Sequence, residues 1–319
     1  MQMSSNVKGI AYLVLAALVI SVQNIVIRWI GGEYSALEIL TFRSLTALPL
    51  TLLFYRREGH RGLPSTQQPK LEYVRGLFLF LSYTTYMMGL VALPLADVEA
   101  IRFSGPLMIT LLSVLMLGEK VGPRRWLALI VGFIGVLLII QPGSATFNLG
   151  SIFVLISVLF YALVVILTRK LQTSDSSATM AYYSSLVYLA ASLVLVPLPA
   201  MVGEMPNVHP SIAFVIRPWS MPTLPDWLIM SALGLIWAAW LYLLSRAYSL
   251  AEASVAAPFE YVSLPINMMW GFLIWHEIPT WSTLVGASLA LGSGLYVLYR
   301  ERVERPKGVE LSNAPESGY

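Results

Sequence analysis

The sequence contains no cysteine and few charged residues. Of its 319 residues, 12% are charged, about half of the roughly 25% that a soluble domain carries. Without cysteine there is no disulfide scaffold, no thiolate nucleophile and no cysteine zinc site. Hydrophobic residues make up 57% of the chain and the mean hydropathy is +0.72. This balance excludes a soluble enzyme and a disordered protein, and it predicts an integral membrane protein.

Long apolar runs recur along the whole chain. A helix needs about 20 apolar residues to cross a hydrocarbon core of about 30 Å, and barrel strands would instead alternate in short pieces. The sequence therefore predicts an all-α protein with ten transmembrane helices, at residues 9–30, 36–55, 72–92, 96–117, 125–140, 150–168, 178–200, 227–247, 253–275 and 281–299.

Two polar segments stand out between and after these runs. Residues 201–226 contain five prolines, which predicts a loop without a regular helix. Residues 301–319 are polar and predict a disordered cytoplasmic tail.

The positively charged residues are concentrated on one predicted side of the membrane. If the N-terminus is cytoplasmic, most of the 20 Lys and Arg residues fall on that same side. Examples are Arg56, Arg57 and Arg61 in one loop, and Arg300 and Arg302 after the last run. By the positive-inside rule, this predicts a multi-pass protein of the cell's inner membrane with both termini in the cytoplasm.

Weak matches recur in the same order in the two halves of the chain. Gly9 recurs as Gly150, and Pro106 recurs as Pro265. Each half holds five runs, and because five is odd the second half must enter the membrane upside down. Inverted repeats are typical of secondary transporters, with a substrate site near the midplane.

Two stretches carry a more specific resemblance. Residues 96–100 (ADVEA), followed by Pro106 and Leu117-Gly118-Glu119, resemble the EamA repeat of the drug/metabolite transporter superfamily, and so does the stretch from Ala257 to Pro265. The resemblance implies ten helices in two inverted five-helix repeats, 8–143 and 149–300. It also implies a central cavity and alternating access.

Ionisable residues at membrane depth are costly and tend to face a cavity or a partner. Glu99, Arg102, Phe103 and Pro106 have spacings that place them on one helical face. We interpret Arg102 as a cavity residue that binds an anionic group of the substrate, because a guanidinium matches a carboxylate or phosphate. The alternative is a local Glu99–Arg102 pair that neutralises itself.

Glu260, next to Tyr261, is the repeat counterpart of Arg102. An acid and a base at equivalent positions suit a zwitterionic substrate. A buried glutamate can also take up a proton, which makes the proton a candidate coupling ion. The alternative is a structural pair with a neighbouring helix.

Aromatic pairs are predicted to complete the substrate site. Tyr83 with Tyr86, and Trp237 with Trp240, are three residues apart and share a helical face. In a pocket these rings would stack on a planar or cationic ligand. The alternative is packing against lipid or neighbouring helices.

Other polar residues of the runs receive separate interpretations. Gln23 and Asn24, two-thirds along the first run, are predicted substrate ligands. Arg43 resembles a family feature and is interpreted as structural, neutralising Glu38 or Glu99.

Residues at the ends of the runs carry no catalytic motif. Glu119 and Glu277 are predicted to cap the helices that follow them. His276-Glu277 is followed by Thr280 at the fifth position, so the HExxH zinc motif fails. Neither a Walker A motif nor a dinucleotide fingerprint is present, which predicts no cofactor, no metal and transport driven by a gradient.

These features predict a secondary-active inner-membrane exporter of a small polar or zwitterionic metabolite, amino-acid-like or metallophore-like. The alternative is an importer of a vitamin or nucleoside-like cofactor of the riboflavin or S-adenosylmethionine type. A membrane-embedded enzyme is disfavoured, because the three histidines stand apart. The expected partners are the lipid bilayer and a small molecule, with no nucleic acid, and both a monomer and a homodimer remain open.

Overall fold

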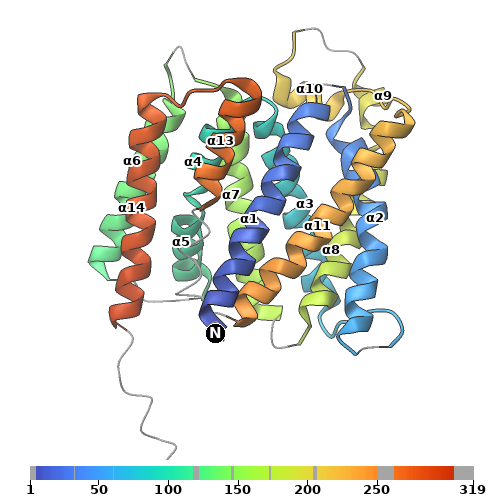
Figure 1. Ribbon diagram of the computed structural model, residues 1–319, viewed down its shortest axis with the longest axis horizontal. Coiled ribbons are helices and arrows are strands. Elements are labelled where there is room, and N and C mark those ends of the chain that lie inside the picture. The colour runs from blue at the N-terminus through green and yellow to red at the C-terminus, as the bar shows by residue number, and fades with distance from the viewer. Residues whose placement is uncertain are drawn as a thin grey trace, which may run out of the picture.

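The computed structural model describes residues 5–31, 33–59, 61–117, 122–144, 147–171, 174–203, 207–250 and 262–304. Within these ranges all regular structure is helical and there is no strand (Figure 1). The helices are α1 (Ser5–Ile30), α2 (Ala36–Arg57), α3 (Pro69–Leu90), α4 (Leu95–Arg102), α5 (Gly105–Leu117), α6 (Pro123–Ile140), α7 (Leu149–Leu171), α8 (Ser177–Leu195), α9 (Leu198–Val202), α10 (Pro210–Ile216), α11 (Leu224–Leu250), α13 (Ser263–Trp275) and α14 (Trp281–Glu304).

The prediction of an all-helical membrane protein is confirmed. Two shorter apolar helices, Trp126–Ile140 and Leu224–Trp240, accompany the helical stretches that are long and apolar enough to cross a membrane. Those longer stretches are Val7–Ile30, Ala36–Arg57, Leu95–Met116, Leu149–Thr168 and Ala178–Val202. Helices α3, α13 and α14 cover three more of the predicted runs.

The run predicted at 96–117 is not one continuous helix. It divides into α4 and α5 at a turn formed by Phe103 and Ser104. Pro106 explains the break, since a proline has no N–H to donate to the carbonyl four residues earlier, here that of Arg102. In the turn, the carbonyl of Ile101 accepts from the hydroxyl of Ser104 at 2.7 Å and from its backbone N–H at 3.0 Å.

The proline-rich segment 201–226 also differs from its prediction as a loop without a regular helix. It contains the seven-residue helix α10. Pro210 occupies its first position, where a missing N–H costs nothing, and His209 precedes it as the capping residue.

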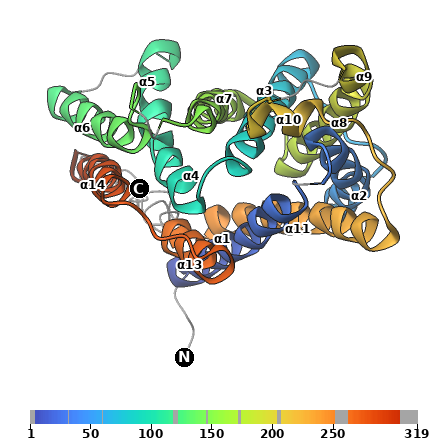
Figure 2. The ribbon, with the colours of Figure 1, turned by 90° about the horizontal axis from the view of Figure 1, so that it is seen from above.

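The most extensive packing joins helices that are far apart in the sequence. The pairs are α3 with α7, α6 with α14, α1 with α11 and α2 with α8 (Figure 2). Each pair takes one helix from before residue 145 and one from after residue 148. The two halves of the chain thus pack against each other through these four helix pairs.

Glycines permit the closest of these approaches. A Cβ atom on Gly135 of α6 would lie 2.6 Å from the carbonyl oxygen of Gly286 in α14, and one on Gly286 would lie 2.4 Å from that of Gly135. Small residues of this kind let helices pack backbone to backbone in membranes.

The bundle has two end faces that hold different loops. The start of α1, the α2–α3 loop and the end of α14 lie together at one face, and α10 lies at the other (Figure 1). Helix α14 extends to Glu304, four residues into the predicted tail, and residues 305–319 lie outside the described ranges.

Candidate functional site

The two predicted aromatic pairs meet in the interior of the bundle. The ring centroids of Tyr83 on α3 and Trp237 on α11 are 5.2 Å apart. Tyr86 lies 5.8 Å from Tyr83, and Trp240 lies 5.0 Å from Trp237. Tyr188 on α8, which the sequence analysis missed, lies 6.5 Å from Tyr83. We call these five rings the aromatic cluster.

Arg43 on α2 lies against the aromatic cluster. Its guanidinium carbon is 4.1 Å from the ring centre of Tyr83, 4.5 Å from that of Trp237 and 5.2 Å from that of Tyr188. The residue is 1% exposed. Among the described residues, ion pairs join Arg28 to Glu277, Glu72 to Arg75, and Glu99 to Arg102, and none of them includes Arg43.

The interpretation of Arg43 as the neutralising partner of Glu38 or Glu99 is therefore wrong. Glu99 is paired with Arg102, and Glu38 instead accepts from the backbone N–H of Ser220 at 3.5 Å. Helical spacing places Arg43 on α2 but does not say which neighbouring helices face it.

Gln23 and Asn24 of α1 are buried polar residues of the same interior. The Gln23 side-chain amide donates to the hydroxyl of Tyr83, and the Asn24 amide donates to Asn267 of α13 at 3.3 Å. The side-chain oxygens of Gln23 and Asn24 have no hydrogen-bond partner among the described residues. Asn267 was not singled out from the sequence, although it is a lone amide in an apolar run.

Glu99 and Arg102 form the predicted pair on α4. Arg102 Nη1 donates to Glu99 Oε1 at 2.9 Å, and the hydroxyl of Ser263 on α13 donates to Glu99 Oε2 at 3.2 Å. The Glu99 side chain is 3% exposed, but that of Arg102 is 39% exposed. The guanidinium of Arg102 also lies 4.9 Å from the ring centre of Tyr86, which connects the pair to the aromatic cluster.

The remaining predicted site residues fall into two groups. Phe103 is buried in the hydrophobic core that also contains Tyr83 and Trp237. Glu260 and Tyr261 lie outside the described residues.

A second ion pair lies where α1, α4 and α13 meet. Arg28 donates to Glu277 through both terminal nitrogens, Nη1 and Nη2, and its guanidinium lies 4.4 Å from the ring centre of Trp275. Glu277 also accepts from the backbone N–H of Leu95 at 3.1 Å.

Glu277 thus caps α4 rather than the helix that follows it, contrary to the sequence prediction. The start of α14 is instead capped by Thr280, whose hydroxyl accepts from the N–H of Thr283 at 3.2 Å. Glu119, predicted to play a similar role, lies outside the described residues.

Polar groups also join the loops near α10. Tyr34 donates to the carboxylate of Asp226 at 2.7 Å, and Thr223 donates to the same oxygen. The hydrogen bonds from Thr223 and Tyr34 hold the pKa of Asp226 below its usual value, while the bond to Asp226 raises the pKa of Tyr34. Burial lowers the pKa of Arg217, which donates to the carbonyl of Gly31 at 2.9 Å.

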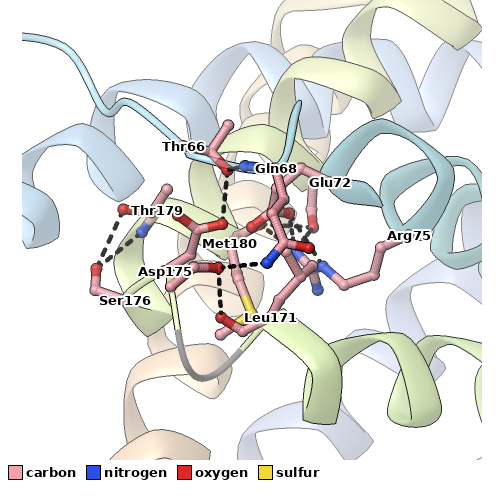
Figure 3. A network of polar contacts seen from close by, with 11 residues as sticks. Thr66, Gln68, Glu72, Arg75, Leu171, Asp175, Ser176, Thr179 and Met180 are labelled. Carbon is pink, nitrogen blue, oxygen red and sulfur yellow. Dashed lines mark hydrogen bonds and ion pairs between the residues drawn. The ribbon is translucent and has the colours of Figure 1, made fainter. Parts of the chain in front are cut away.

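At the opposite face, a network joins the start of α3 to α8 (Figure 3). Arg75 donates to Glu72 at 3.2 Å, to the carbonyl of Met180, and to the hydroxyl of Ser184 at 2.9 Å. Nearby, Thr66 donates to Asp175 at 2.6 Å. Both members of the Glu72–Arg75 pair are buried, so this network ties two helices together away from water.

An apolar groove lies apart from these polar groups. It has a volume of about 250 Å³ between α5 and α6 and is lined by Ser104, Leu107, Met108, Leu111, Trp126, Ile130, Phe133 and Ile134. Such a lining suits hydrocarbon rather than a polar solute. Within the described residues, no group of three His, Cys, Asp or Glu side chains could hold a metal ion.

Charged and amide side chains buried inside an all-helical membrane bundle are typical of membrane solute transporters. The comparisons with known proteins agree. The chain belongs to the EamA-like transporter family, whose model matches residues 7–141 and 148–299.

Its relatives are transporters with different named solutes. The chain is 27% identical to an S-adenosylmethionine uptake transporter of Rickettsia bellii, over 94% of this chain and 97% of that protein. It is 26% identical to a riboflavin transporter of Vibrio cholerae, over 91% and 92%. It is 30% identical to the pseudopaline exporter CntI of Pseudomonas aeruginosa, over 88% and 92%.

A solved structure supports the fold. A protein described only as "Crystal structure of protein" aligns with a TM-score of 0.58 at 16% identity, over 94% of this chain and 98% of that chain. The likeness concerns the fold alone.

Proposed function

We propose that this protein is a secondary-active transporter that exports a small zwitterionic metabolite across the inner membrane by alternating access. Its two halves, 8–143 and 149–300, would be inverted five-helix copies. The helix packing supports this arrangement, because exchanging the halves turns the α1–α11 pair into the α7–α3 pair. The same exchange leaves the α2–α8 and α6–α14 pairs unchanged.

The observation that carries the proposal is the Glu99–Arg102 pair. It lies on α4 next to a helix break, the Glu99 side chain is buried, and the Arg102 side chain is 39% exposed inside a predicted membrane run. A charge held at membrane depth is expected to line a substrate pathway. Paired acidic and basic groups suit a solute that carries both charges.

The direction of transport is part of the proposal. The relatives include one named for uptake and one named for export, so both directions occur in the family. Import of a cofactor with a planar ring, such as S-adenosylmethionine or riboflavin, is the second candidate. The aromatic cluster favours it, since aromatic side chains stack on planar ligands.

Transport assays with matched variants test the function. Cells that overproduce the protein should release an amino-acid-like compound into the medium, and inverted membrane vesicles should accumulate it. Arg102→Gln keeps a polar side chain but removes the charge, and it should abolish flux at near-normal amounts of protein in the membrane. Arg61→Gln, in the exposed α2–α3 loop, is the control and should retain flux.

The other outcomes are equally defined. Uptake by intact cells without uptake by inverted vesicles would assign the import direction instead. Wild-type flux in the Arg102→Gln protein would remove the pair from the substrate path. Glu260→Gln should also abolish flux, and if Glu260 carries the coupling proton the variant should lose the pH dependence of any residual transport.

Cysteine labelling tests the orientation, since the natural chain has no cysteine. Cysteines at the exposed positions Glu33 and Asn207 should react with an impermeant thiol reagent from the periplasm, and one at Ser65 should not. Ser35 is a poorer reporter than Glu33, because it is 2% exposed and caps α2. Labelling of Ser65→Cys from outside would reverse the proposed topology.

A further inference from the structure

Several buried polar atoms have no partner among the described residues, and two of them belong to residues that contact Tyr83. Those two are Nη1 of Arg43 and Oε1 of Gln23, and Oδ1 of Asn24, on the next residue of α1, is a third. Their residues are 1%, 0% and 1% exposed. Buried polar groups in folded proteins are nearly always hydrogen-bonded, so a local group of exceptions calls for an explanation.

Two of these residues approach the same ring from different helices. Gln23 of α1 donates to the Tyr83 hydroxyl, and Arg43 of α2 lies with its guanidinium 4.1 Å from the Tyr83 ring centre. The cationic guanidinium of Arg43 therefore lies at the ring of Tyr83, and the neutral amide of Gln23 lies at its hydroxyl. Each of the two groups keeps one hydrogen-bonding atom without a partner.

The charge of Arg43 makes the arrangement unusual. Arg28, Arg75 and Arg102 each have a carboxylate within ion-pair distance. In the described chain Arg43 has no such carboxylate and lies among tyrosine and tryptophan side chains, with Nη1 left unpartnered. Ring faces attract a guanidinium, but they do not saturate its hydrogen bonds.

We infer that Arg43 and Gln23 bind the α-amino-carboxylate head group of the transported solute. Nη1 of Arg43 donates to the carboxylate, and Oε1 of Gln23 accepts from the ammonium group. Asn24, the next residue of α1, offers a second acceptor. This inference rests on the proposed function and deepens it, because it divides the solute between a head-group subsite on α1 and α2 and the Glu99–Arg102 pair on α4.

The unused atoms favour this ligand over a simple anion. A phosphate would satisfy Arg43, but it would place negative charge near the unpartnered oxygen of Gln23. A zwitterionic head group satisfies both, since it carries an acceptor and a donor at its two ends. Among the solutes for which the relatives are named, S-adenosylmethionine has this head group and riboflavin lacks it.

The first test needs no ligand and compares two buried arginines in the purified protein. A buried arginine whose hydrogen-bonding capacity serves a ligand lowers the stability of the ligand-free protein. The Arg43→Met protein should therefore unfold at the wild-type Tm or above it. Arg75→Met is the matched control and should melt well below wild type, because Arg75 has partners in the fold. An equal fall in Tm for both variants would make Arg43 structural and overturn the inference.

The second test measures recognition of the head group. Membrane vesicles would receive a panel of labelled amino acids and S-adenosylmethionine, with competition by carboxylate-free analogues such as decarboxylated S-adenosylmethionine. The wild type should prefer the intact compound by at least about tenfold. Arg43→Met should lose that preference, and Arg43→Lys should restore part of it.

Failure of the inference can be told apart from failure of the proposed function. Flux of a solute that depends on Arg102 but ignores the carboxylate would overturn the head-group subsite and leave the transporter intact. Absence of flux for every α-amino acid in the panel would also overturn the subsite. Arg102-independent flux would only remove the Glu99–Arg102 pair from the substrate path, whereas absence of flux for every solute tested would contradict the proposed function itself.

Discussion

Arg75 and Arg43 are both buried, yet they lie in opposite environments. Arg75, near the start of α3, is bound by Glu72, by Ser184 and by the carbonyl of Met180. Arg43, on α2, is even less exposed but is surrounded by the rings of Tyr83, Tyr188 and Trp237. The first guanidinium is satisfied by the fold. The second keeps hydrogen-bonding capacity that the described fold does not use.

This difference follows the position of each arginine in the bundle. The Arg75 network lies at the end face that carries the α2–α3 loop, where it joins α3 to α8 (Figure 3). Arg43 lies where α2, α3, α8 and α11 meet around the aromatic cluster. A buried ion pair stabilises one arrangement of helices, whereas a buried guanidinium without a carboxylate partner is expected where a solute binds and leaves.

The largest expected effect is on the satisfied arginine. Arg75→Met removes one partner of a buried ion pair and leaves Glu72 charged without compensation, which costs about 3–5 kcal/mol. We expect a large fall in Tm and in the yield of folded protein, measured by thermal unfolding in detergent. The double variant Glu72→Leu with Arg75→Met removes both charges and should recover much of the loss. If the double variant is as unstable as the single one, the pair is not what stabilises this face.

An intermediate effect is expected at Gly234, which lets α11 approach the backbone of α2 beside Arg43. A Cβ atom there would lie 1.9 Å from the Thr46 hydroxyl, and also 2.5 Å from the carbonyl oxygen of Arg43. Since a backbone atom cannot move aside alone, Gly234→Ala should separate the helices and cost about 1–3 kcal/mol. It should also reduce flux, because Trp237 and Arg43 would part.

Gly292→Ala is the matched control for this comparison. Gly292 lies within α14 and has no neighbouring atom within 4 Å of an added Cβ, so alanine should be neutral or stabilising there. Equal Tm values and equal flux for the two alanine variants would contradict the close packing of α2 and α11.

Much of the fold could be predicted because hydropathy and proline positions act locally. The apolar runs predicted helices over 9–30 and 150–168, and the structure has α1 and α7 there. Pro106 lies inside the run that was predicted as one helix, and the sequence does not show whether such a proline kinks the helix or breaks it. Pro210 was counted as a helix breaker, but at a first helical position it begins α10 instead.

The site was predictable only within single helices. The three-residue spacing of Tyr83 with Tyr86 correctly predicted a shared face, as it did for Trp237 with Trp240, and the structure brings the two faces together. Spacing within one helix does not predict which residues of other helices a side chain contacts. Arg43 was therefore assigned carboxylates that it does not meet, and Glu277 was assigned the adjacent helix although its partners are on α1 and α4.

The smallest expected effect concerns Asp226, a partly exposed carboxylate that sharpens the contrast with the buried groups. Hydrogen bonds from Thr223 and Tyr34 lower its pKa in the folded protein. A carboxylate with a lowered pKa contributes stability above its unfolded value of about 3.9, and this contribution is lost as the pH falls through the folded value. Asp226→Asn should therefore flatten the fall of Tm on acidification, measured from neutral pH down to about pH 3, and Tyr34→Phe should flatten it less. Identical curves for Asp226→Asn and wild type would show that these hydrogen bonds do not discriminate between the folded and unfolded states.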